Sequence, residues 1–211
     1  MASLLILGAG GHGRVVADAA LAGGQWSRVF ACDRDPARSG GDLPHGGSGE
    51  LLHGVMLMPI AQAMAVGVPV HVAIGKAAHR ERECAALRAG ALATVTHPTA
   101  SISRFATLAP GCFIAAQAVV APGASLGTSV IVNHGAVVDH DVVVGEFSHI
   151  APRAALGGGV SIGKRVLVGA GASVLPGIRI ADDVTIGAGA VVVDHIDEPG
   201  TYAGVPARRL Q

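Results

Sequence analysis

An aliphatic side chain recurs at every sixth position through the second half of the chain, for sixteen repeats without an insertion. A long flat strand would instead alternate its side chains with period two. A coil of three short strands explains period six, because each strand with its corner takes six residues and turns one aliphatic side chain inward. The repeat therefore predicts a left-handed parallel β-helix. The positions are Ile102, Leu108, Ile114, Val120, Leu126, Val132, Val138, Val144, Ile150, Leu156, Ile162, Val168, Val174, Ile180, Ile186 and Val192.

Residues eighteen positions apart should stack in ladders along this β-helix, ~4.8 Å from coil to coil. Sixteen repeats make a little over five coils. A small or branched residue follows each aliphatic one after four positions, from Ala106 to Ile196, and suits a narrow interior. The aromatic content of 3% agrees with a prism too thin for rings. Glycines often follow the aliphatic residue directly, where we expect the chain to bend. These are Gly127, Gly145, Gly157, Gly163, Gly169 and Gly187.

The N-terminal segment has a different pattern, a strand, a glycine turn and a helix. Apolar Leu4–Leu7 runs into Gly8–Gly13, which has G-x-G-x-x-G spacing, and a helical pattern follows over residues 14–22. Such a turn lets backbone N–H groups approach a phosphate at the helix N-terminus. The glycines could equally serve only to pack the strand closely against the helix.

Asp33 follows a second expected strand, Arg28–Cys32, and lies twenty residues after the glycine turn, where a ribose-binding acid is expected. A third strand is predicted at Val70–Ile74, a helix at residues 76–89 and a short strand at Leu92–Val95. A full dinucleotide-binding domain needs two such halves. We therefore expect a half-sized α/β Rossmann-like domain that binds a single nucleotide.

The expected boundary between the two parts gives a nucleotide-sugar-binding domain at 1–97 and a β-helix domain with a short C-terminal tail at 98–211. Fifteen basic residues balance fifteen acidic ones, so no broad field favours nucleic acid. Residues 105–138 lack charged side chains, but Pro110, Pro122 and four glycines argue against a membrane-inserted helix. Three cysteines without a zinc or redox motif, and no signal-peptide pattern, predict a cytoplasmic protein.

Polar residues gather in one stretch of the repeat region. A histidine beside a carboxylate is the usual general-base arrangement, and His140 lies between Asp139 and Asp141. A zinc site built from His134, His140, His149 and Asp141 is the alternative, although their spacing matches no zinc signature. Exposed histidines without a function are the third interpretation. The stretch comprises Asn133, His134, Asp139, His140, Asp141, Glu146 and His149.

Five segments together resemble one family, the hexapeptide acyltransferases that acetylate nucleotide-linked amino sugars. It includes the UDP-4-amino-sugar N-acetyltransferase of bacillosamine synthesis and proteins similar to sialic-acid O-acetyltransferases. The segments are the N-terminal GAGGHG turn, AIG at 73–75, VNHGAVVDHD at 132–141, GEFSHIAP at 145–152 and AGVPAR at 203–208. The resemblance implies acetyl-CoA as co-substrate, no metal, and a homotrimer with active sites between neighbouring β-helices.

The resemblance also implies roles for individual residues. His140 would be the general base, and Asp141 would orient it, with Asp139 as a possible substitute. Asn133 matches a substrate-side position, and the role of His134 stays open. Acetyl-CoA contacts are implied for His149, Gly158 and Ala170. The nucleotide-sugar pocket would be formed by Gly10, Gly11, His12, Gly13, Asp33 and Gly75.

Direct transfer is the expected mechanism, since no cysteine is placed to form an acyl-enzyme. Four basic residues are candidates to meet the CoA phosphates, although each could also be an ordinary solvated charge. They are Lys164, Arg165, Arg179 and Arg208. Two other functions stay open on the same fold. The acceptor could be a sugar hydroxyl, or the protein could be a non-catalytic scaffold that binds nucleotide sugars.

Overall fold

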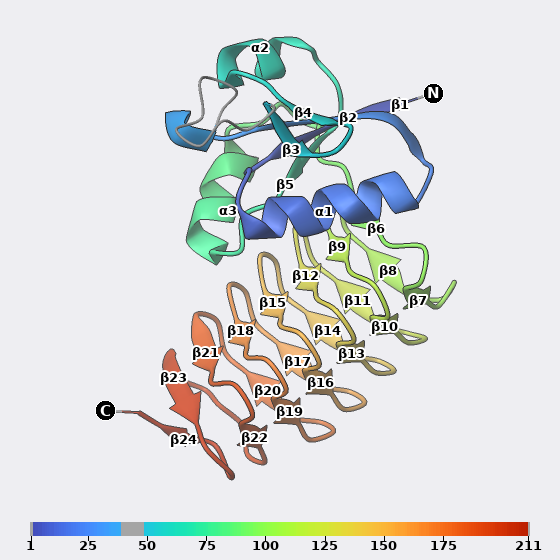
Figure 1. Cartoon of the computed structure of the whole chain (residues 1–211). Coiled ribbons are helices and arrows are strands. Elements are labelled where there is room, and N and C mark those ends of the chain that lie inside the picture. The colour runs from blue at the N-terminus through green and yellow to red at the C-terminus, as the bar shows by residue number, and fades with distance from the viewer. Residues whose placement is uncertain (1, 39–48, 211) are drawn as a thin grey trace. The chain divides into compact units, whose positions relative to one another are not determined.

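The structure is a computed structural model that describes residues 2–38 and 49–210. It divides into two compact units, Met1–Pro98 and Thr99–Gln211. The first unit is a small α/β domain and the second is a parallel β-helix, so the predicted fold class is confirmed (Figure 1). No helix in the described part of the chain is long and apolar enough to cross a membrane.

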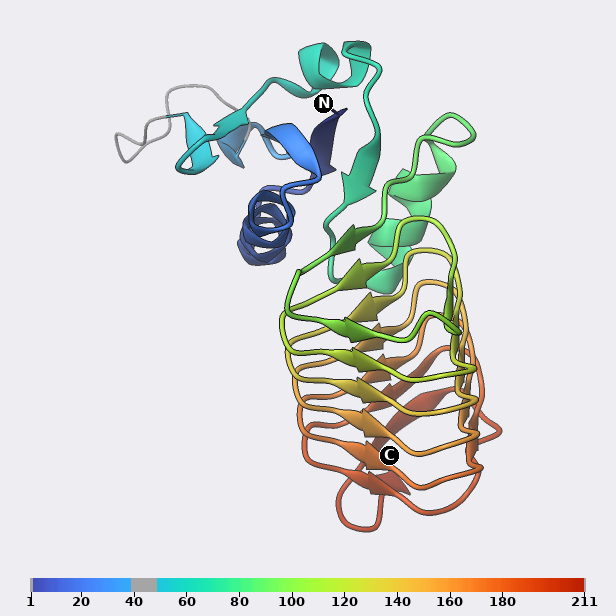
Figure 2. The same ribbon diagram turned by 90° about the vertical axis from the view of Figure 1, so that its right-hand side faces the viewer.

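The first unit is built on a five-stranded sheet with the order β3-β4-β2-β1-β5, parallel except for β3. The strands of this sheet are β1 (Ala2–Leu7), β2 (Trp26–Cys32), β3 (Glu50–Leu52), β4 (Val55–Leu57) and β5 (Val70–Val72). A later strand, β6 (Val95–Thr96), is not part of this sheet. The helices are α1 (Gly11–Ala22), η1 (Pro36–Arg38), α2 (Ile60–Ala65) and α3 (Ala77–Ala85). Figure 2 shows α1 and α3 on opposite sides of this sheet.

The carboxyl ends of β1, β2 and β5 meet at one edge of the sheet, because the three strands are parallel neighbours. The chain leaves β1 toward β2 on one side, while β5 lies on the other side of β1. Such a switch point opens a crevice at the carboxyl ends of the strands. The residues that follow these strands, Gly8, Asp33 and Ala73, therefore come together there.

Several predicted boundaries in this unit were wrong. Helix α1 begins at Gly11 rather than Arg14, because the uncapped glycines join its first turn. The third strand ends at Val72, and α3 is shorter than expected. Leu92 forms only an isolated bridge with Val70. Two three-residue strands, β3 and β4, and the one-and-a-half-turn α2 were not predicted, since elements this short carry no readable period.

His71 is a buried histidine in the middle of β5. Its Nδ1 donates a hydrogen bond to the Ala93 carbonyl at 2.8 Å, and burial lowers its pKa to about 4. The folded state therefore binds fewer protons than the unfolded state between about pH 4 and 6.5. The stability that His71 contributes is complete above pH 6.5 and is lost as the pH falls toward 4.

We expect the free energy of unfolding of this unit to fall by roughly 3 kcal/mol from pH 7 to pH 4 through His71. Urea titrations read by the fluorescence of Trp26, the single tryptophan, measure it. His71→Asn should flatten the dependence, whereas the same change at exposed His53 should leave it intact. An equally steep dependence in His71→Asn would contradict the assignment.

The second unit stacks short strands, most of them of two residues, on three faces (Figure 2). Face 1 carries β7 (Ser101–Ile102), β10 (Val119–Val120), β13 (Val137–Val138), β16 (Ala155–Leu156), β19 (Ser173–Val174) and β22 (Val191–Val192). Face 2 carries β8 (Thr107–Leu108), β11 (Ser125–Leu126), β14 (Val143–Val144), β17 (Ser161–Ile162) and β20 (Arg179–Ile180). Face 3 carries β9 (Phe113–Ile114), β12 (Ile131–Val132), β15 (His149–Ile150), β18 (Leu167–Val168) and β21 (Val184–Ile186), then β23 (Gly200–Ala203) and β24 (Arg208–Arg209).

From β7 to β22 the strands pair in parallel with a shift of eighteen residues, so that Val120 pairs with Val138 and Val138 with Leu156. At the C-terminal end β23 pairs with β21 at a shift of sixteen, and β24 is antiparallel to β23. The predicted aliphatic positions from Ile114 onward are all buried and form one continuous core. Ser148 is a polar residue at one of the inward positions, buried beside this core. Its hydroxyl donates to the Gly163 carbonyl at 2.7 Å and accepts from the Val166 N–H at 3.0 Å, which satisfies it without water.

The glycines after the aliphatic positions have a different role from the one expected. A Cβ added to Gly145 would lie 2.5 Å from the carbonyl carbon of Gly163 in the next coil. These glycines therefore permit close stacking of coils rather than a bend. The left-handed backbone comes three positions after the aliphatic residue, as at Asp141 (φ 60°) after Val138. Aspartate tolerates this conformation better than most side chains.

Candidate active site

His140 and Asp141 lie together at the first corner of the β-helix, the turn between face 1 and face 2. The Nδ1 atom of His140 lies 2.9 Å from the Asp141 Oδ2 atom. Asp139 instead accepts the backbone N–H of His140 through Oδ1 at 2.7 Å. Of the two flanking acids, Asp141 is therefore the partner of the ring. When Nδ1 donates to Asp141, Nε2 carries the lone pair that a general base needs.

Two glycines from adjacent coils make room for this pair. A Cβ added to Gly158, one coil after His140, would overlap the imidazole ring, at 2.5 Å from Cε1 and 3.0 Å from Cδ2. A Cβ added to Gly123, one coil before Asp141, would overlap its carboxylate. The side chains of His140 and Asp141 thus rest on bare backbone. Gly123 was missed in the sequence, although its position eighteen residues before Asp141 is the signal that identifies it.

The pKa of His140 is raised above its usual value, first by the hydrogen bond to Asp141 and then by the charge of Asp139. Both side chains of the pair are well exposed in the single chain, 62% for His140 and 72% for Asp141. An open pair of this kind has no wall against which a substrate could be held.

Asn133 and His149 meet near the third corner, the turn between face 3 and face 1. Asn133 Oδ1 accepts the N–H of His134 at 2.8 Å, which directs its amide nitrogen toward His149 Nε2 at 3.1 Å. An amide nitrogen can only donate, so His149 accepts through Nε2. His134 is exposed at this corner, and Ala170 lies two coils further on in the same column.

The small residues of the third corner leave its surface open. Ala170 and Gly171, and Ala188 and Gly189 one coil later, are exposed and carry little or no side chain. An added Cβ at Gly171 or Gly189 meets nothing within 4 Å. This strip of bare backbone could accommodate a long, narrow ligand.

The structure separates the polar stretch into different corners. His140, Asp141 and Gly158 lie at the first corner, whereas Asn133, His134, His149 and Ala170 lie at or beside the third. The four residues of the zinc alternative are therefore not brought together in one chain. Among the residues that the structure describes, no group of three or more His, Cys, Asp or Glu side chains could hold a metal ion.

The basic candidates for the CoA phosphates are paired with carboxylates in the single chain. Lys164 lies 2.9 Å from Glu146, and Arg165 forms a two-pronged bridge to Asp183 at 2.7 and 2.8 Å. Arg179 with Asp197, at 3.6 Å, and Arg208 with Asp194, at 3.5 Å, are looser and more exposed pairs. Of the four, Arg179 and Arg208 are therefore the better placed to exchange their carboxylate for a phosphate.

A cavity of about 380 Å³ opens at the switch point of the first unit. Five of the six residues expected in the nucleotide-sugar pocket line it, namely Gly10, Gly11, His12, Asp33 and Gly75. Gly13 does not. It is buried in α1, where an added Cβ would overlap the carbonyl oxygen of Gly8, so this glycine serves close packing of the turn and the helix.

Asp33 is bonded to the backbone around the cavity. Its Oδ2 accepts the N–H of Ala9 at 2.7 Å, and its Oδ1 accepts the N–H of Asp35 at 2.9 Å. The carboxylate thereby holds the glycine turn against the end of β2. A carboxylate oxygen accepts more than one hydrogen bond, so this role leaves room for a ligand hydroxyl as well.

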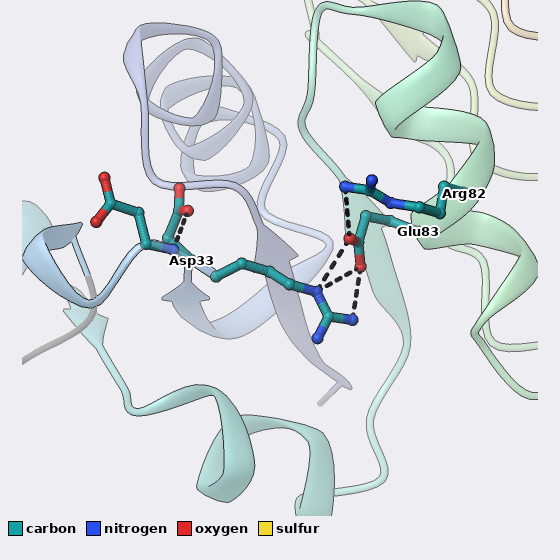
Figure 3. Close-up of polar contacts among 5 residues, drawn as sticks. Asp33, Arg82 and Glu83 are labelled. Carbon is teal, nitrogen blue, oxygen red and sulfur yellow. Dashed lines mark hydrogen bonds and ion pairs between the residues drawn. The ribbon is translucent and has the colours of Figure 1, made fainter.

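Charged residues of the cavity that the sequence did not reveal are Arg34, Arg38, Arg82 and Glu83. With Asp33, the lining holds three guanidiniums and two carboxylates, a net positive set that suits an anionic ligand. Figure 3 shows the side chains of Arg82 and Glu83 beside α3, pointing toward the segment that contains Asp33. Buried Arg80 donates to the carbonyls of Ile74 and Gly75 at 2.7 and 2.9 Å, which fixes the loop that contains Gly75.

Comparison with known proteins places both units in one family. The model of the PglD N-terminal domain matches residues 3–87, and that of the bacterial transferase hexapeptide (six repeats) matches residues 159–194. The acetyltransferase domain of PglB from Neisseria gonorrhoeae is 33% identical, with a TM-score of 0.88 and 100% of each chain covered. Its complex with acetyl coenzyme A matches at 34% identity and a TM-score of 0.88, over 99% of this chain and 98% of that one.

PerB from Caulobacter crescentus, solved with CoA and GDP-perosamine, is 32% identical, with a TM-score of 0.87 over 100% of this chain and 98% of that one. A histidine-to-alanine mutant of the same organism's GDP-perosamine N-acetyltransferase matches equally well, at 32% identity and a TM-score of 0.88. The fold and these similarities define a hexapeptide-repeat acyltransferase. The chain belongs to the family of the PglB acetyltransferase domain and GDP-perosamine N-acetyltransferase.

Proposed function

We propose that this protein transfers the acetyl group of acetyl-CoA to the amine of a nucleotide-linked amino sugar, with a UDP-linked 4-amino sugar as the first candidate. The observation that carries the proposal is the full-length similarity to relatives solved with acetyl coenzyme A or with CoA and GDP-perosamine. We also propose that the protein acts in the cytoplasm.

His140 is the proposed general base. The sugar amine attacks the thioester carbonyl carbon while Nε2 of His140 removes a proton from the nitrogen. Asp141, bonded to Nδ1 at 2.9 Å, holds the ring tautomer and stabilises the imidazolium that forms. The tetrahedral intermediate then expels the CoA thiolate, and His140 donates to this sulfur the proton that it took from the amine. Backbone N–H groups, with that of Gly158 as the candidate, would stabilise the oxyanion.

The site is proposed to form between subunits of a homotrimer. The proposed base at the first corner and the proposed acetyl-CoA contacts His149 and Ala170 near the third corner belong to different edges of one prism. A neighbouring chain that turns its third corner toward the first corner would unite them. It would also cover the exposed His140–Asp141 pair, and the bare strip at Ala170–Gly171 could take the extended arm of CoA.

The cavity of the first unit is the proposed nucleotide site. The N-terminus of α1 has no acidic residue in its first turn and no side-chain cap, so its backbone N–H groups can meet a phosphate. The three arginines of the lining add positive charge beside Gly10 and Gly11. A diphosphate linked to a nucleoside and a sugar fits this electrostatic character.

A thiol-release assay with acetyl-CoA tests the proposal directly. The acceptors are UDP-, GDP- and dTDP-linked amino sugars, each compared with the same nucleotide alone. We expect CoA release that depends on one of the amino sugars. Release with none of them, by a protein that binds the nucleotides, would instead favour a non-catalytic scaffold.

Asp141→Asn should lower the pKa of His140, because the hydrogen bond to Asp141 is the main cause of its elevation. The base form is the neutral ring, so activity falls as the pH drops below that pKa. We therefore expect the acid limb of kcat/KM to move to lower pH in Asp141→Asn, while kcat falls on the order of tenfold or more. Asp139→Asn, which keeps the bond to the ring, should move the limb less. An unmoved limb in Asp141→Asn would refute the pairing.

A further inference from the structure

Glu83 is a nearly buried carboxylate that the proposed chemistry does not use. It lies on α3 and is 3% exposed. A buried charge is costly unless a counter-charge and hydrogen bonds offset it. Arg34 supplies both, with Nε 3.0 Å from each carboxylate oxygen and Nη2 2.8 Å from Oε2. Arg82 adds a second cation at 3.7 Å (Figure 3).

This ion pair joins two walls of the nucleotide cavity. Arg34 follows β2, Glu83 lies on α3, and 49 positions separate them in the chain. Both line the cavity together with Asp33. Because Asp33 also holds the N–H groups of Ala9 and Asp35, the backbone on each side of Arg34 is fixed as well.

The pairing leaves one edge of the Arg34 guanidinium for a ligand. Glu83 takes the edge formed by Nε and Nη2, and Nη1 lies on the opposite edge of the planar group. The Arg34 side chain is 61% exposed, although it is anchored at its tip. A guanidinium held in this way loses less conformational freedom when it binds an oxyanion than a free one would.

We propose that Glu83 is a positioning residue of the nucleotide site, which holds Arg34 so that its free edge binds an anionic oxygen of a nucleoside diphosphate. The inference rests on the proposed function, since it assumes that the cavity takes a nucleotide. It predicts that nucleotide affinity depends on Glu83, a carboxylate whose oxygens are bonded to Arg34.

Calorimetric titration of the whole protein with UDP, GDP and dTDP tests the inference. Glu83→Gln keeps the shape of the side chain and one acceptor but removes its charge. We expect the dissociation constant of the nucleotide that binds wild type to rise about tenfold, with unchanged stoichiometry and unchanged acetyl-CoA affinity. Arg34→Lys keeps the positive charge but loses the planar guanidinium, which can bind Glu83 on one edge and a ligand on the other. This variant should weaken binding to a similar extent. The double variant Arg34→Gln/Glu83→Gln should be no weaker than Arg34→Gln alone.

The matched control is Asp183→Asn, which breaks the two-pronged bridge to Arg165 in the other unit and should leave nucleotide binding unchanged. If wild type binds none of the three nucleotides, the nucleotide assignment fails and the inference with it. If wild type binds and Glu83→Gln binds with the same dissociation constant, the inference alone is overturned. If Glu83→Gln binds with a lower stoichiometry but an unchanged dissociation constant, the role of Glu83 is purely structural. This outcome also overturns the inference.

Discussion

Replacing His140 by alanine should lower kcat by ~10²–10⁴-fold, the usual contribution of a positioned general base. The ring is the group at the first corner whose Nε2 is free to take a proton while Nδ1 is bonded to Asp141. The side chain is 62% exposed and packs into no core, so its removal should not affect folding. Acetyl-CoA binding, which we propose for other residues, should persist.

The measurement is the steady-state rate of thiol release at saturating acetyl-CoA and acceptor, with the thermal unfolding midpoint as a check on folding. His53→Ala is the matched control, since it removes another exposed histidine, which lies in the first unit and does not line its cavity. We expect this control to keep the wild-type rate. A near-normal kcat in His140→Ala would exclude the base role.

Gly158→Ala should cost about 10²-fold in kcat, because small displacements of a catalytic group have effects of this size. The new methyl group would overlap the His140 ring, and the exposed ring is the part that can move. Its movement breaks the alignment with Asp141. The change should leave the unfolding midpoint near that of wild type, since the ring that must move belongs to no hydrophobic core.

A double-mutant cycle separates this steric mechanism from any contact that Gly158 itself makes with substrate. If Gly158→Ala acts through the ring, it should add no further loss in the His140→Ala background. Additive losses would mean that the Gly158 backbone acts independently, for example as an oxyanion donor. Each variant is assayed with the acceptor that gives the highest wild-type rate.

The β-helix was predictable because its period is local and uninterrupted. Every inward position from Ile114 onward could be read from the spacing of aliphatic residues, and the pairing of His140 with Asp141 needs only neighbouring residues. The spacing of eighteen also relates Gly158 to His140. The period did not reveal which residue of each repeat adopts positive φ at the bend. Residues as different as Asp141 and Phe147 adopt it, so residue type does not mark the position.

The cavity of the first unit was less predictable, for a physical reason. The Arg34–Glu83 pair joins residues 49 positions apart, and no local pattern marks a carboxylate that tertiary packing will bury. Glycine spacing indicated the turn, yet it did not distinguish Gly10 and Gly11, which line the cavity, from Gly13, which packs against Gly8. That distinction depends on where the helix lies against the turn.

Acetylation of an amine on a nucleotide-linked sugar is the activity that we propose for this protein. Its most direct test compares the best amino-sugar acceptor with the same nucleotide sugar carrying a hydroxyl in place of the amine, and identifies the product of each by mass spectrometry. We predict one acetyl group on the amino sugar and none on the hydroxyl counterpart, with the activity lost in His140→Ala. Acetylation of the hydroxyl sugar at a comparable rate would contradict the proposed specificity for an amine and show that the protein is an O-acetyltransferase.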